Sequence, residues 1–231
     1  MTASLLIADL IPTCESALET VRGLHGAARA SVTEMVSKDG KIDGALFEAN
    51  QQAAHGYAWL STYVAALEQM LDWGKRLSAQ GKFGELEQLM LQSVYGEYCA
   101  QIYGGIPMSQ GEIIRPSDLG LDSATCHKFH SEAVSVLRKS GNAAAVRVRI
   151  AQLIEDGHHF GELALDDETL ELIRDQFRRF VEDNVAPYAH EWHLKDELIP
   201  MDVLNAVAEM GVFGLTLPEE YGGLGMGKTS M

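Results

Sequence analysis

The sequence has few of the features that would suggest an oxidising compartment or a membrane. Its three cysteines (Cys14, Cys99 and Cys126) are odd in number, far apart and without Cys-x-x-Cys spacing, so we expect small buried thiols in a reduced protein. No uninterrupted apolar run reaches the ~20 residues of a membrane-spanning helix. The N-terminus lacks the basic stretch of a signal peptide. We therefore expect a cytoplasmic protein with no membrane partner.

Positive charge is also scarce. Eighteen Lys and Arg residues oppose 33 Asp and Glu residues, which gives a formal net charge of -15 at pH 7. A surface this acidic repels phosphate backbones, which argues against nucleic acid as a partner. Most of the excess negative charge lies between residues 155 and 220, which contain 17 acidic and 4 basic residues. The chain thus becomes strongly acidic from about residue 155 onward.

No convincing alternation typical of strands is present, and the dominant period is helical, so we predict an all-α fold. Over residues 50–80, two adjoining apolar stripes advance in steps of three and four. They predict a long helix with more than one packing neighbour, ended by Gly81. A second helix is expected over residues 83–104, antiparallel to the first because the connection is short.

The rest of the chain suggests a helical extension followed by a second, smaller part. One or two helices are expected in the first 45 residues. The elements expected after the long helices are an ordered loop (106–122), two shorter helices (123–140 and 143–155) with Ser140, Gly141 and Asn142 as stop and cap between them, and a glycine-containing linker (156–166). The predicted domains are therefore a helical bundle at 1–155 and a second helical part at 167–231.

The second part contains clear helix start and stop signals. Asp166 or Asp167 can cap a helix whose apolar face reaches Val185, before Pro187 disfavours helical geometry at the residue that precedes it. Pro200 is well placed to open another helix, and Gly211 to end it.

Several chemical motifs lack the context that their function requires. Residues 222–229 read GGLGMGKT, which fits a phosphate-binding loop, yet no strand is expected before them and no helix after them. His190 and His193 could share a helical face, but no third ligand is evident at a suitable spacing, so surface histidines are expected and no metal site. His158 and His159 are expected in a solvated loop. No catalytic nucleophile or acid–base pair stands out.

The C-terminal part resembles a known enzyme family. Residues 217–225 read LPEEYGGLG and residues 210–214 read MGVFG. Further matching residues precede them in the same order: Phe177, Phe180, Pro187, Glu191, Asp196, Ile199 and Pro200. Over residues 165–231 the chain is therefore similar to the opening helices of an acyl-CoA dehydrogenase.

The resemblance implies an enzyme that oxidises an acyl-CoA between its α and β carbons, with FAD as cofactor. The family fold holds its flavin mainly by a middle β-domain and a neighbouring subunit, which implies a homo-oligomer, and its base is a glutamate of the C-terminal domain. Electrons pass to an electron-transfer flavoprotein. Those segments are absent from the 231 residues, so this piece is expected to be inactive, with no catalytic residue and no bound cofactor.

Within this chain, the resemblance offers one plausible wall of the acyl pocket. It is the turn formed by Tyr221, Gly222, Gly223, Leu224 and Gly225.

The first 160 residues would then be an extension. Residues 96–98 and 104–112 are similar to one member of the family that has a long helical N-terminal extension. Residues 101–105, with Glu112 and Arg115, also resemble a stretch of the family's C-terminal domain that helps to hold flavin, but Pro107 and Met108 replace the favoured Gly-Tyr. The alternative for this stretch is a Gly-Gly helix cap before a loop. The alternative function for the chain is a non-catalytic helical scaffold whose apolar stripes bind partners.

Overall fold

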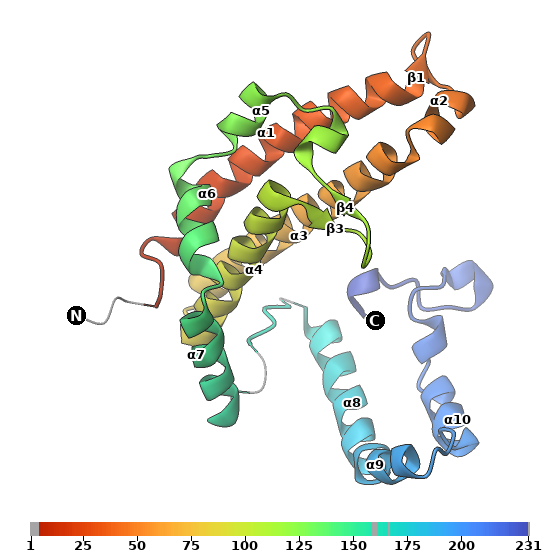
Figure 1. The fold of residues 1–231 in the computed structure, drawn as a ribbon. Coiled ribbons are helices and arrows are strands. Elements are labelled where there is room, and N and C mark those ends of the chain that lie inside the picture. Colours follow the sequence, from red (N-terminus) through yellow and green to blue (C-terminus); the bar gives the residue numbers. More distant parts are fainter. Residues whose placement is uncertain (1–4, 159–160, 166, 231) are drawn as a thin grey trace. The chain divides into compact units, whose positions relative to one another are not determined.

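Helices make up most of the chain, which confirms the all-α class. The computed structural model describes residues 5–158, 161–165 and 167–230. It divides into two compact units, Met1–Ala164 and Leu165–Met231. Figure 1 shows the order of their elements along the chain. None of the helices in these described segments is long and apolar enough to cross a bilayer.

The first unit is built on three long helices. Helix α1 (Leu10–Val36) packs along α3 (Gln51–Ala79), and α4 (Glu85–Gly104) packs against both (Figure 1). The shorter helical elements are α2 (Gly44–Ala49), the 3-10 turn η1 (Pro116–Leu119), α5 (Ser123–Lys128), α6 (Glu132–Val136), the π-helical turn η2 (Leu137–Gly141) and α7 (Ala144–Glu155). Two antiparallel pairs of two-residue strands complete the unit: β1 (Ser37–Lys38) with β2 (Lys41–Ile42), and β3 (Ile106–Pro107) with β4 (Ile113–Ile114).

The core of this unit surrounds α4. Leu91, Tyr95 and Cys99 are fully buried there, and the Tyr95 hydroxyl donates a hydrogen bond to the carbonyl of Leu67, 2.9 Å away. Burial raises the pKa of the Cys99 thiol to about 12. Cys14 is likewise a buried free thiol, so the expectation of small buried thiols is confirmed for these two cysteines, while Cys126 is only half-buried.

The two long helices predicted from periodicity are confirmed, but the single helix predicted over 123–140 is wrong. The chain breaks between α5 and α6 because Phe129 turns into the core, where it is 3% exposed. The Ser131 hydroxyl then accepts a hydrogen bond from the Val134 amide and starts a new helix. Asn142 is no side-chain cap for α7 either, because its amide nitrogen donates to Glu97 instead.

Helix α4 and η2 approach each other closely at two glycines. A Cβ on Gly96 would lie 2.7 Å from the backbone nitrogen of Asn142, and one on Gly141 would lie 2.3 Å from the carbonyl oxygen of Gln92. Both distances are shorter than any real Cβ contact, and the opposing atoms belong to the backbone. Only glycine at both positions allows the two backbones to approach this closely.

The segment after α7 is attached to the first unit. The Glu162 amide donates to the Glu87 carboxylate, and the indole of Trp73 donates to the Glu162 carbonyl. Arg76 donates to the carbonyl of Ala164. Independent folding of the first unit remains our prediction, and these bonds lead us to propose Ala164 rather than Glu155 as its end.

The second unit contains three helices and a series of turns. Helix α8 (Glu168–Asn184) is followed by α9 (Ala186–Leu194) and α10 (Met201–Glu209), and then by the 3-10 turns η3 (Val212–Gly214), η4 (Glu219–Tyr221) and η5 (Lys228–Ser230). Asp167 caps α8 by accepting from the amides of Thr169 and Leu170. Asp166, the other predicted cap, lies outside the described residues. Pro200 precedes α10, and Gly211 ends it in the left-handed region, as predicted.

This unit has almost no core of its own. Among its described residues only Leu215 and Ser230 are buried. Large apolar side chains stay in solvent, among them Leu172 (70% exposed), Leu198 (91%) and Phe213 (66%). A groove of about 390 Å³ also lies open between α8, α9 and α10. Three helices with this surface bury too little apolar area to offset the chain entropy lost on folding.

The α4–η2 contact predicts opposite effects of the same substitution at two helical glycines. Gly96→Ala should lower the free energy of unfolding by about 1–3 kcal/mol, because the methyl group meets backbone that cannot move aside. Gly26→Ala is the matched control, since nothing lies within 4 Å of its Cβ position, and it should raise stability by about 0.5–1 kcal/mol. Urea unfolding of both variants measures the difference. Equal effects at the two positions would contradict the importance of the contact.

Candidate functional site

The turn singled out by the sequence is held in one conformation by backbone hydrogen bonds. The amides of Leu224 and Gly225 donate to the carbonyls of Gly214 and Leu217, both at 2.8 Å. The amide of Gly223 donates to the Pro218 carbonyl, and a Cβ on Gly223 would lie 2.2 Å from the Leu217 oxygen. Gly223 is therefore required where the chain folds back over residue 217.

The predicted wall residues differ in exposure and backbone conformation. The side chains of Tyr221 and Leu224 face solvent, at 74% and 54% exposure. Gly222 and Gly225 have φ angles of 80° and 61°, in the left-handed region that favours glycine. The turn thus presents one aromatic and one aliphatic side chain on a fixed backbone.

The apparent phosphate loop lacks the required context here as well. A bend and the 3-10 turn η4 precede Gly222, and the three residues of η5 follow Gly227, so no strand leads in and no α-helix begins there within the described residues. His190 and His193 do lie on one helix, α9, and both are exposed. No group of three His, Cys, Asp or Glu residues suited to a metal occurs in the described part of the chain. His158 is exposed in the turn after α7, and His159 lies outside the described residues.

The stretch that resembles a flavin-holding segment is occupied by structural bonds. The Tyr63 hydroxyl hydrogen-bonds to the Gln101 side-chain oxygen, and the Gln101 amide donates to Glu97 at 2.7 Å. Asn142 donates to the other carboxylate oxygen of Glu97, at 2.8 Å. Gly105 follows the end of α4 and donates to the Gln101 carbonyl. The geometry is that of a helix cap stabilised by a polar network across α3, α4 and η2.

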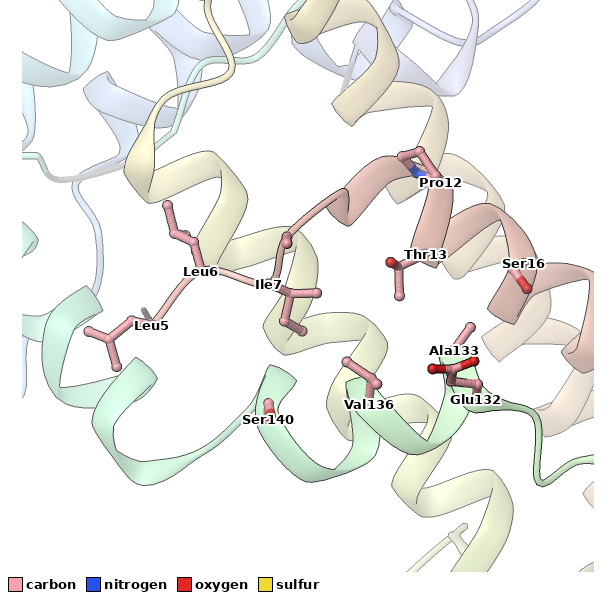
Figure 2. A pocket seen from close by; sticks show the side chains of 11 residues that line it. Leu5, Leu6, Ile7, Pro12, Thr13, Ser16, Glu132, Ala133, Val136 and Ser140 are labelled. Atoms are coloured by element: carbon pink, nitrogen blue, oxygen red, sulfur yellow. The ribbon is translucent and has the colours of Figure 1, made fainter. Parts of the chain in front are cut away.

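A groove of the first unit lies at the N-terminal segment. It has a volume of about 580 Å³. Figure 2 shows its labelled walls: Leu5, Leu6 and Ile7 from the N-terminal segment, Pro12, Thr13 and Ser16 from α1, and Glu132, Ala133, Val136 and Ser140 from α6 and η2. Its lining includes a single carboxylate and no histidine, cysteine or lysine, so it offers an apolar surface rather than acid–base chemistry.

The buried side-chain amide of Gln92 holds in place the N-terminal segment that lines this groove. The Gln92 side chain accepts from the Ile7 amide at 3.1 Å and donates to the Leu5 carbonyl at 3.0 Å, and it is fully buried. Sequence reasoning missed both the groove and Gln92. The apolar period of α4 gave no signal for it, because buried side chains surround most of this helix.

The part of the chain that matches a known protein family coincides with the second unit of the structure. Residues 167–231 match the family model "Acyl-CoA dehydrogenase, N-terminal domain", which is the second unit apart from its first two residues. Over residues 167–231 the chain is thus similar to the acyl-CoA dehydrogenase family. The likeness inferred from the LPEEYGGLG turn is confirmed.

One similar protein also matches the first unit, whereas others match only about a quarter of the chain. The whole chain is 50% identical over 234 aligned residues to (2S)-methylsuccinyl-CoA dehydrogenase of Cereibacter sphaeroides. Glutaryl-CoA dehydrogenase of Desulfococcus multivorans is 33% identical over 25% of the chain and 15% of its own length. Isovaleryl-CoA dehydrogenase of Arabidopsis thaliana is 39% identical over 28% of the chain and 16% of its own length. The narrower likeness of residues 96–98 and 104–112 to one family member is confirmed by the Cereibacter relative, of which the chain spans 42% of the length.

The network around Glu97 predicts a pH-dependent stability. Hydrogen bonds from Gln101 and Asn142 hold the pKa of Glu97 below its ordinary value of 4.5. A carboxyl group with a lowered folded-state pKa contributes stability above its unfolded pKa and loses it as pH falls through the folded pKa. Glu97→Gln should therefore reduce the free energy of unfolding at neutral pH, with a difference from the wild type that shrinks in acid below 4.5.

Urea unfolding at several pH values measures this difference. Glu34→Gln, at an exposed position of α1, is the control and should show little effect at any pH. A loss at Glu97→Gln that stays constant from neutral to acid pH would refute the role of its charge.

Proposed function

We propose that this chain forms the N-terminal part of an FAD-dependent acyl-CoA dehydrogenase that acts on (2S)-methylsuccinyl-CoA. The observation that carries the proposal is the 50% identity to an enzyme of that name over the entire chain, extension included. The relatives named for glutaryl-CoA and isovaleryl-CoA align over 57 and 67 residues only. Identity in the extension therefore favours the first substrate over the other two.

The surface of the second unit supports a larger assembly. Its helices leave Leu172, Leu198 and Phe213 in solvent and an open groove between α8, α9 and α10. Surfaces of this kind are buried in a stable protein, because exposed apolar area on this scale favours association. We propose that further segments of a longer enzyme cover it, in a homo-oligomer in the cytoplasm.

The stretch that resembles a flavin-holding segment, residues 101–105, does not fit a flavin. Gln101 is engaged by Tyr63 and Glu97, and Gly104 and Gly105 form a helix end rather than an open cradle. We propose that FAD and the catalytic base belong to segments outside these 231 residues, and that the enzyme passes electrons to an electron-transfer flavoprotein. The flavin supplies the redox chemistry in such enzymes, while the protein positions the substrate.

This chain's own contribution to the substrate site, in our proposal, is the turn from Tyr221 to Gly225. Its backbone is fixed by the bonds to Gly214 and Leu217, and Tyr221 and Leu224 are exposed and free to contact a ligand. A rigid turn with apolar side chains suits a pocket wall, because its shape is set before the substrate arrives.

A chimera tests the proposed function directly. Residues 1–231 are joined to the remaining part of the Cereibacter relative and assayed with a dye acceptor. We expect bound flavin and faster oxidation of (2S)-methylsuccinyl-CoA than of glutaryl-CoA or isovaleryl-CoA. The isolated 231-residue chain is the control and should be colourless and inactive. Stoichiometric flavin in the isolated chain, or a folded chimera that prefers another of these substrates, would overturn the proposal.

Two glycines of the C-terminal segment test the proposed wall in the same chimera. Gly223→Ala forces a methyl group onto the Leu217 carbonyl, so the turn must shift and kcat/KM should fall by about tenfold or more. Gly227→Ala meets no atom within 4 Å and should leave kcat/KM unchanged. Equal activity of the two variants would remove the turn from the substrate site.

A further inference from the structure

A second cavity of the first unit has a lining unlike that of the groove in Figure 2. It has a volume of about 400 Å³ and lies between α1, the end of α4, η1 and α5. This size is in the range of small-molecule sites. Its polar lining comes from Arg115, Ser117, His130 and Tyr103, and its apolar lining includes Leu24 and Phe129.

The charged group of this lining is a cation without a counter-charge. No carboxylate lines the cavity, and no ion pair engages the Arg115 guanidinium among the described residues. Two acids lie three residues away along the chain: Asp118 accepts from the Arg115 backbone amide at 2.7 Å, and Glu112 accepts from the Ser109 hydroxyl at 3.0 Å. Arg115 is a solvent-exposed member of this lining, so its guanidinium is accessible to a ligand.

A second cation, Arg138, packs on the Tyr103 ring that lines the cavity. The Arg138 guanidinium carbon lies 3.5 Å from the centre of the Tyr103 ring, and its Nε is buried without a hydrogen-bond partner in the described part of the chain. The ring of His130 meets Tyr103 edge-on, with centroids 4.9 Å apart. This stack fixes the aromatic wall and adds positive potential behind it.

We propose that this cavity binds a small organic monocarboxylate with a compact apolar body. The planar fork of Arg115 matches a carboxylate in geometry, Ser117 and His130 offer further hydrogen bonds, and Leu24 and Phe129 receive the apolar body. Asp118 beside Arg115 opposes a second negative charge, and inorganic phosphate has no apolar body for Leu24 and Phe129 to receive. The site belongs to the extension and is independent of the proposed dehydrogenase function.

Binding of benzoate to the 231-residue chain tests the proposal, with neutral benzamide and inorganic phosphate as comparison probes. Calorimetry should give saturable benzoate binding, with benzamide and phosphate at least about tenfold weaker, because each lacks either the charge or the apolar body. In amide NMR spectra, benzoate should shift Ser117 and His130 and leave the second unit unchanged. The comparison of the three probes needs no variant, so it stands even if a substitution prevents folding.

Matched variants locate the carboxylate. Arg115→Gln should weaken benzoate binding by about tenfold or more, whereas Arg29→Gln, the same charge change at an exposed position of α1, should leave it unchanged. Absence of saturable binding, equal affinity for benzamide or phosphate, equal affinity in the two arginine variants, or amide shifts confined to other residues would each overturn the proposal.

Discussion

The contact between Gly96 of α4 and Gly141 of η2 is the constraint on which the first unit depends. Backbone lies against backbone there, because a Cβ at either position would fall within 3 Å of main-chain atoms of the other segment. The close approach brings Asn142 to Glu97 and closes the core over Tyr95 and Cys99. Gln92, one turn before Gly96, then holds the N-terminal segment through Leu5 and Ile7. One close contact therefore positions the polar network and the groove of Figure 2.

The two units differ in how much apolar surface they bury. The first closes a core of aliphatic and aromatic side chains from α1, α3 and α4. The second has sound local structure, with Asp167 capping α8 and Gly211 ending α10, but leaves its apolar residues exposed. Local signals suffice to form helices, whereas stability needs a buried face. The second unit, which is similar to the acyl-CoA dehydrogenase N-terminal domain, thus forms helices but buries few of its apolar side chains.

The candidate functional groups also differ between the two units. The family turn at residues 217–225 lies in the second unit, with backbone bonds that fix its shape. The unpaired Arg115 and the aromatic stack of Tyr103 and Arg138 lie in the first unit, in the extension. Both places are turns or helix ends, where functional groups commonly occur. The extension thus has structural features of its own beyond the family domain.

The sequence by itself determined the all-α class, the extents of α3 and α4 and the family of the second unit, because these depend on local signals. Apolar periodicity, glycines at helix ends and the spacing within LPEEYGGLG act over a few residues. Tertiary structure alone decided the break at Phe129, the π-helical turn before Asn142 and the cavity beside Arg115. Each of these depends on partners far along the chain: a core that admits Phe129, a glycine on α4 that faces η2, and helices that bring Leu24 to Arg115. No local pattern encodes such pairings, so a helical period continues through 123–140 in the sequence where the folded chain turns.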